Sequence, residues 1–90
     1  MKIQIDPHTL QRAQKRGVTE DEIRDTITNG ISIPAKQERF AKSMIFAFQA
    51  MYNNIFYKEK KVEVYYVIEQ EIIITVTVYA FYGKFLENEL

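Results

Sequence analysis

Two runs of alternating residues in the second half of this 90-residue chain constrain its fold most. Residues 61–69, KVEVYYVIE, and residues 72–81, IIITVTVYAF, have the period of two that is typical of half-buried β-strands. The short segment EQE separates the apolar stretches, so they should pair as an antiparallel hairpin. In the first run, Val62, Val64, Tyr66 and Ile68 share one face, opposite Lys61, Glu63, Tyr65, Val67 and Glu69. In the second run, Ile72, Ile74, Val76, Val78 and Ala80 share one face, opposite Ile73, Thr75, Thr77, Tyr79 and Phe81.

The first third of the chain has the start and stop signals of two short helices. In chain order they are Asp6 as N-cap with Pro7 at the first helical position, Gly17 as a left-handed stop, Thr19 and Glu22 with capping-box spacing, and Asn29–Gly30 as the second stop. Acidic residues fill the first turn of the second helix, where the helix dipole favours negative charge. These signals predict a helical hairpin over residues 6–30.

The middle of the chain predicts a second pair of strands. The segments FAKSMIFAFQAMY and IFYKE flank Asn53–Asn54, and Asn tolerates the positive φ of a tight turn. The segment ISIPAKQ is interpreted as a connector because Pro34 disfavours helix before it, and KIQI near the start is either a short edge strand or an ordered lead-in. We therefore expect one α+β domain over residues 1–90, with two N-terminal helices packed on a three- to four-stranded antiparallel sheet at 38–82.

Composition and charge exclude several classes of function. The chain has one His, no Cys, no HExxH motif and no Gly-rich phosphate loop, so no metal or cofactor is expected. The start MKIQID lacks the apolar run of a signal peptide, and no stretch reaches the roughly 20 apolar residues of a membrane span, so we expect a cytoplasmic protein with no membrane partner. The second helix carries four acids and one Arg, which excludes a DNA-reading helix.

Charge is segregated along the chain although the formal net charge is zero. Residues 1–16 carry a net +3 and residues 31–62 a net +4, whereas residues 17–30 and 63–90 are acidic. On the first helix, His8 shares one side with Arg12, Lys15 and Arg16, all within about 100° of one another, and Leu10 and Ala13 lie on the opposite side. This stripe is either a solvated polar face or an anion site in which His8 is available for proton transfer.

Two further groups of residues have both a structural and a functional interpretation. Thr75, Thr77 and Tyr79 share one face of the last strand, and Lys58 lies before the neighbouring strand; Thr and Tyr are also ordinary strand residues. The segment 40–57 is rich in Phe, Met and Tyr: Phe40, Met44, Phe46, Phe48, Met51, Tyr52, Phe56 and Tyr57. Most of these should be core, but alternation cannot bury all of them in so small a domain, and those left at the surface would suit a protein partner.

Several motifs resemble the DUF4258 family of small prokaryotic proteins. They are PHTLQRAQKRGVTEDEI, the NG helix stop, the basic segment ERFAK and KKVEVYYVIEQEIIITVTVY, which together cover about residues 6–82. The family is similar in layout to the RelE/ParE-like toxins and other compact metal-independent ribonucleases of the BECR type, in which helices precede a curved antiparallel sheet. The resemblance implies that fold, cleavage of RNA without a metal, and a small cognate antitoxin protein of the DUF2283 type as partner.

Transferred residue by residue, the resemblance implies a site formed by His8, Arg12, Thr77 and Tyr79, with Arg16 and Lys58 binding substrate. The implied reaction is attack of a ribose 2′-OH on the adjacent phosphate. His8 would move the proton, Arg12 would stabilise charge on the phosphorane, and Thr77 or Tyr79 would hydrogen-bond the phosphate or a base. Two other functions stay open. One is a non-catalytic protein-binding domain with a Phe/Met-rich interface, either an inactive relative of the toxins or the neutralising partner itself, and the other is a structural or regulatory module without nucleic acid.

Overall fold

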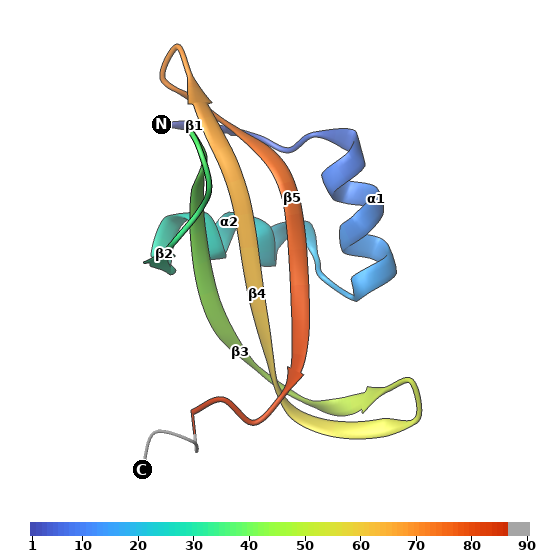
Figure 1. The fold of residues 1–90 in the computed structure, drawn as a ribbon. Helices are drawn as coiled ribbons and strands as arrows, with labels where there is room; N and C mark the ends of the chain where they lie inside the picture. Colours follow the sequence, from blue (N-terminus) through green and yellow to red (C-terminus); the bar gives the residue numbers. More distant parts are fainter. Residues whose placement is uncertain (87–90) are drawn as a thin grey trace.

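The computed structural model, which describes residues 1–86, has two helices and five strands in one mixed sheet (Figure 1). The elements in chain order are β1 (Lys2–Gln4), α1 (Pro7–Arg16), α2 (Glu20–Asn29), β2 (Ile31–Ile33), β3 (Phe40–Tyr52), β4 (Ile55–Glu69) and β5 (Ile72–Gly83). The strand order across the sheet is β1-β5-β4-β3-β2. β1 pairs parallel to β5, and the other neighbours are antiparallel. The α+β arrangement with N-terminal helices is confirmed.

The expected three- to four-stranded, purely antiparallel sheet of the RelE/BECR type is wrong. The two additional strands are three residues each and form opposite ends of the sheet. β1 aligns Ile3 with Ile73, a partner 70 residues away that its short sequence cannot specify. β2 ends at Ile33 because Pro34 has no N–H with which to continue a ladder, so the segment interpreted as a connector is an edge strand followed by a loop. The sheet therefore starts at residue 2, well before the expected residue 38.

Both predicted hairpins are confirmed, and both use tight two-residue turns. Asn53–Asn54 joins β3 to β4 and Gln70–Glu71 joins β4 to β5, and all four residues have positive φ, between 51° and 66°. Positive φ at both central residues is the type I′ geometry that matches the twist of paired strands. Asn adopts a positive φ readily, whereas a positive φ is energetically unfavourable for Gln and Glu.

A β-bulge in β5 changes which residues share a face. Tyr65 pairs with Thr77, but the next residue, Tyr66, pairs with Thr75, so Val76 is an extra residue in the ladder. The expectation that Thr75, Thr77 and Tyr79 share one face is therefore wrong for Thr75. Its hydroxyl is buried on the helix side, where it donates to Thr9 Oγ1 over 3.0 Å.

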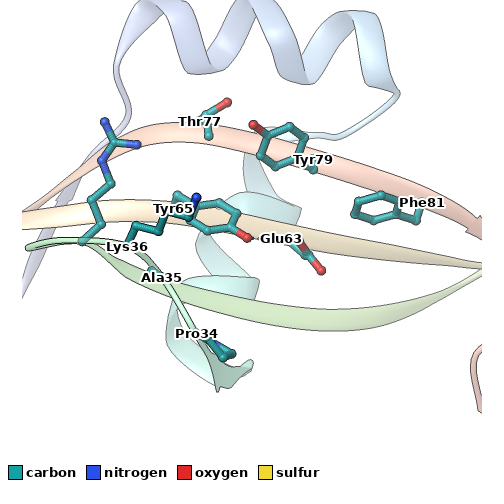
Figure 2. Close-up of a pocket in the computed structure, with 9 residues that line it drawn as sticks. Pro34, Ala35, Lys36, Glu63, Tyr65, Thr77, Tyr79 and Phe81 are labelled. Atoms are coloured by element: carbon teal, nitrogen blue, oxygen red, sulfur yellow. Dashed lines mark hydrogen bonds between the residues drawn. The ribbon is translucent and has the colours of Figure 1, made fainter.

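The helices cover different parts of the sheet. α2 packs on the face of β3 and β4, whereas α1 lies along the edge of β5 beyond the reach of β1 (Figure 1). Their boundaries follow the sequence signals: Asp6 accepts from the backbone of His8, Gly17 takes a left-handed φ of 75°, and Thr19 and Glu22 form a complete capping box. The opposite face of β4 and β5 carries neither helix and faces the loop after β2 (Figure 2).

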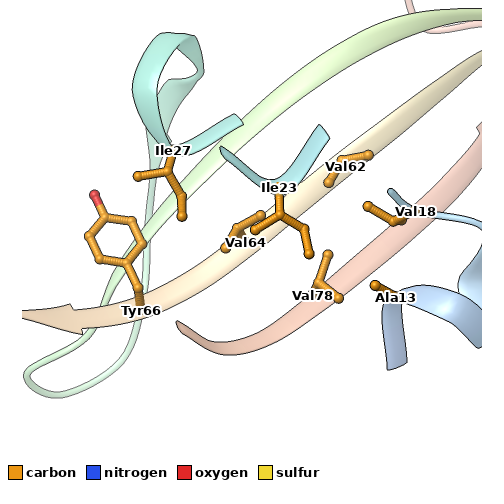
Figure 3. Packing of buried hydrophobic residues seen from close by; sticks show 8 residues of the cluster. All are labelled: Ala13, Val18, Ile23, Ile27, Val62, Val64, Tyr66 and Val78. Carbon is orange, nitrogen blue, oxygen red and sulfur yellow. The ribbon is translucent and has the colours of Figure 1, made fainter. Parts of the chain in front are cut away.

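The hydrophobic core lies between the helices and one face of the sheet (Figure 3). Ile23, Val62, Val64 and Val78 are fully buried, and Ala13, Val18, Ile27 and Tyr66 complete the cluster. Burial of each large aliphatic side chain stabilises the fold by about 1.5–3 kcal/mol. Leu10, expected beside Ala13, is only half-buried, and Thr9 takes the buried position instead.

A buried lysine joins the two helices to the sheet. Lys60 on β4 is 4% exposed, and its Nζ donates to the carbonyl of Gly17 and to Glu22 Oε1, both over 2.8 Å. Glu22 also accepts from the backbone of Thr19, so one carboxylate serves the capping box and the lysine. Within residues 1–86, every fully buried polar side-chain atom has a hydrogen-bond partner.

Candidate functional site: a basic, tyrosine-walled cavity

A cavity of about 460 Å³ lies on the helix-free face of the sheet. Its floor is formed by neighbouring positions of β4 and β5, because the register places Tyr65 opposite Thr77 and Glu63 opposite Tyr79. The loop between β2 and β3 forms the other wall, through Pro34, Ala35, Lys36 and Arg39, and Phe81 closes one end. Figure 2 shows the floor and loop residues facing the same space.

Two arginines of α1 reach this site from the edge of β5. Arg12 Nη1 donates to Thr77 Oγ1 over 2.8 Å. Arg16 donates through Nη1 to the carbonyl of Val78, and its guanidinium lies 5.0 Å from the centre of the Tyr79 ring. Because β1 pairs only with residues 72–74 of β5, Arg16 also satisfies one backbone carbonyl of a strand edge that would otherwise be open. The two arginines therefore support the fold as well as placing positive charge beside the cavity.

The tyrosines of the floor are held in a fixed arrangement. The rings of Tyr65 and Tyr79 meet edge to face with centroids 5.7 Å apart, and the Tyr65 hydroxyl donates to Glu63 Oε1 over 3.4 Å. Burial, with the charge of Glu63, raises the pKa of Tyr65 above its usual 10.0. The Tyr65 phenol is therefore neutral at physiological pH and serves as a hydrogen-bond donor.

The charge around the cavity is mainly positive. Arg12 and Arg16 lie on one side and Lys36 and Arg39 on the other, against the single carboxylate of Glu63 on the floor. In the part of the chain that the structure describes, Lys36 and Arg39 have no ion-pair partner. A partly enclosed surface with cations on two sides and aromatic rings between them favours a planar or phosphorylated anion.

Four of the six residues expected at the site meet there. Thr77 and Tyr79 line the cavity, and Arg12 and Arg16 contact them directly. His8 is exposed, one helical turn before Arg12, and is not among the residues that line the cavity. Lys58 lies elsewhere, at a separate depression beside Phe56, Tyr57, Gly83 and Lys84. The structure therefore groups the arginines with the last strand, and leaves His8 and Lys58 outside the cavity.

Four chemically important residues of the cavity were not expected from the sequence: Lys36, Arg39, Glu63 and Tyr65. Extending the register of the 70–71 turn along both strands would place Glu63 and Tyr65 opposite Val78 and Val76, and the bulge at Val76 shifts them to Tyr79 and Thr77. Lys36 and Arg39 have no such signal, because their position depends on how the loop after Pro34 returns over the sheet.

Among residues 1–86, no group of three or more His, Asp or Glu side chains is placed to hold a metal ion. Within the same residues, no helix is long and apolar enough to cross a membrane. The cavity and its border carry guanidinium, ammonium, phenol, hydroxyl and carboxylate groups, and the imidazole of His8 is exposed one helical turn before Arg12. Comparison of the chain with protein-family models, curated proteins and solved structures finds no match.

Proposed function

We propose that this protein is a metal-independent ribonuclease of the cytoplasm that binds RNA at the tyrosine-walled cavity. The observation that carries the proposal is the contact of Arg12 with Thr77 at a cavity flanked by cations on both sides. Such a surface suits RNA, because RNA phosphates attract guanidinium groups and RNA bases stack on aromatic rings. The sequence resemblance to the DUF4258 family leads to the same expectation.

In this proposal, Arg12 stabilises the reacting phosphate. The hydrogen bond from Nη1 to Thr77 fixes the direction of the guanidinium, and the group has four further N–H donors for phosphate oxygens. Donors held in place before the reaction stabilise the added negative charge of a phosphorane without reorganisation. The Tyr79 hydroxyl, on a half-exposed ring beside Arg16, is the second donor.

His8 is the candidate for proton transfer. Its imidazole is exposed on the turn of α1 that precedes Arg12, so a phosphate held by Arg12 would lie near it. His8 would remove the proton of the ribose 2′-OH as the 2′ oxygen attacks phosphorus. The bond from phosphorus to the 5′ oxygen breaks, and His8 returns the proton to that oxygen, which gives a 2′,3′-cyclic phosphate and a 5′-OH. Lys36, Arg39 and Arg16 would hold neighbouring phosphates, and Lys58 a more distant one.

Induced expression tests this proposal in cells. Wild-type protein should arrest growth and yield RNA fragments with cyclic phosphate ends, whereas His8→Ala and Arg12→Gln should restore growth. Lys15→Gln is the matched control, because Lys15 is an exposed cation on the same helix outside the cavity. Normal growth and intact RNA with the wild-type protein would reject the proposal, and arrest by all four proteins would exclude the named residues.

A second candidate function is docking of a small partner protein, and one feature of the β3–β4 hairpin favours it. Met51, Ile55 and Phe56 near the hairpin tip are 60%, 54% and 54% exposed, on the part of the hairpin that extends past the core (Figure 1). Exposed Met and aromatic side chains are typical of protein interfaces. A cognate antitoxin, of the DUF2283 type in the family resemblance, would bind there.

Size-exclusion chromatography with a small protein of the DUF2283 type tests this second function. A complex should form with wild-type protein and be lost with Met51→Ser combined with Phe56→Ser. Phe81→Ser provides the control, since Phe81 is 44% exposed on the cavity side. No complex with the wild-type protein, or an equal complex with the double variant, would reject docking at this hairpin.

A further inference from the structure

One carboxylate stands among the cations and aromatic rings of the helix-free face. Glu63 lies on the floor of the tyrosine-walled cavity and also lines an adjoining cavity of about 450 Å³, beside Ile31, Ile33 and Ile45. It is partly exposed, and its one hydrogen bond within the described residues is the long one that Tyr65 donates to Oε1. Most of the acceptor capacity of this carboxylate therefore remains open to a ligand.

A carboxylate is a selective partner for a nucleobase. Guanine has two neighbouring donors on its Watson–Crick edge, N1–H and the N2 amino group, which match the two oxygens of a carboxylate. Adenine and cytosine each place an acceptor nitrogen next to their amino group, and uracil places a carbonyl on each side of N3–H. For those bases, one carboxylate oxygen would face another acceptor, which is repulsive.

The surroundings of Glu63 fit a base rather than a phosphate. The ring of Tyr79 lies on the neighbouring strand directly opposite Glu63, and Tyr65 lies two residues along β4 on the same face, so aromatic surface borders the carboxylate. The cations are at the rim of the cavity, on α1 and on the loop after β2, where a sugar–phosphate backbone would pass. A phosphate next to Glu63 itself would be repelled.

We propose that Glu63 reads guanine, and that the tyrosine-walled cavity binds single-stranded RNA with an unpaired guanine against Tyr79 or Tyr65. This inference rests on the proposed function, which identifies the bound polymer as RNA, and it adds which base of that RNA the cavity recognises. A bidentate contact of this kind discriminates against the other bases by about tenfold to a hundredfold in affinity.

Binding and cleavage can be measured separately with modified oligonucleotides. The probes are fluorescent tetranucleotides with 2′-O-methyl riboses, which cannot undergo 2′-OH attack, identical except for G, A, C or U at one internal position. Fluorescence anisotropy should give a dissociation constant for the guanine probe at least tenfold below the other three. Glu63→Gln, which replaces one acceptor by a donor, should reduce that preference below threefold. Glu69→Gln, an exposed acid on the same strand outside the cavity, should leave it unchanged.

The outcomes of this binding experiment test the guanine preference independently of the ribonuclease proposal. Equal binding of the four probes, or a guanine preference that survives Glu63→Gln, would overturn the reading of guanine by Glu63 even if unmodified RNA is cleaved. A guanine preference that depends on Glu63 would support it even if no RNA is cleaved, and only the ribonuclease proposal would then fail.

Discussion

The buried ammonium of Lys60 gives the sharpest test of how this fold is held together. Its Nζ lies 2.8 Å from the carbonyl oxygen of Gly17, at the end of α1, and 2.8 Å from Glu22 Oε1, in the first turn of α2. Replacing Lys60 with Met keeps an unbranched apolar stem and removes both bonds. The carbonyl and the carboxylate then lose their charged donor in a place where water has little access.

The size of the effect follows from these contacts. A hydrogen bond to a charged group contributes about 1.5–3 kcal/mol, and breaking a buried ion pair costs about 3–5 kcal/mol. The Glu22 side chain is 21% exposed and still accepts from Thr19, so water recovers part of its loss. We therefore expect Lys60→Met to lower the free energy of unfolding by about 3 kcal/mol, out of roughly 5–13 kcal/mol for a chain of this length.

Urea unfolding followed by circular dichroism measures this difference. Lys61→Met is the matched control, because Lys61 lies on the opposite face over the rings of Phe81 and Phe85, where a cation–π contact contributes about 0.5–1 kcal/mol. In a double-mutant cycle, Glu22→Gln should cost much less in the Lys60→Met background than in the wild type. A loss below 1 kcal/mol for Lys60→Met, or equal losses for the two lysines, would refute the argument.

Three further predictions concern local features of the fold. Replacing Gln70–Glu71 with Asn-Gly should raise the free energy of unfolding by about 1 kcal/mol in urea unfolding, because both native residues hold positive φ; no gain would contradict this. Thr75→Val should lower it by about 1–3 kcal/mol, since the buried hydroxyl accepts from the Asp6 backbone and donates to Thr9, whereas Thr28→Val on the exposed side of α2 should have little effect. Burial raises the pKa of Tyr82 from 10.0 to about 12. The stabilisation that this phenol provides should therefore be complete below pH 10 and lost as pH rises toward 12. In an ultraviolet titration, the Tyr82→Phe variant should lack the phenol that ionises last in the wild-type protein.

Much of this fold could be predicted from the sequence because helix caps and tight turns depend on residues close together in the chain. The helix boundaries at Asp6, Gly17 and Thr19 depend on residues within one turn of each other, and a two-residue turn sets the pairing of each hairpin. The features that were missed depend on distant parts of the chain. An edge strand was one of the two interpretations of KIQI and β2 was interpreted as a connector, because both segments are too short to indicate their partners. The bulge at Val76 interrupts residues 74–79, which alternate regularly in the sequence.

The candidate site, like the fold, has one part that was predicted from the sequence and another that was not. Arg12 and Thr77 are 65 residues apart, and their expected proximity, which came from the family resemblance, agrees with a direct hydrogen bond. The loop wall formed by Lys36 and Arg39 was not expected, since no local pattern fixes the path of a loop across a sheet. His8 is exposed and does not line the cavity, so its expected role depends on where a substrate phosphate lies.

Cleavage of RNA by the purified protein in the presence of EDTA tests the central claim most directly. We predict fragments that end in 2′,3′-cyclic phosphate with wild-type protein and with Lys15→Gln, and a loss of about a hundredfold or more with Arg12→Gln, because that change removes donors that act on the transition state. Intact RNA with wild-type protein, or equal cleavage by Arg12→Gln, would contradict a catalytic site at this cavity.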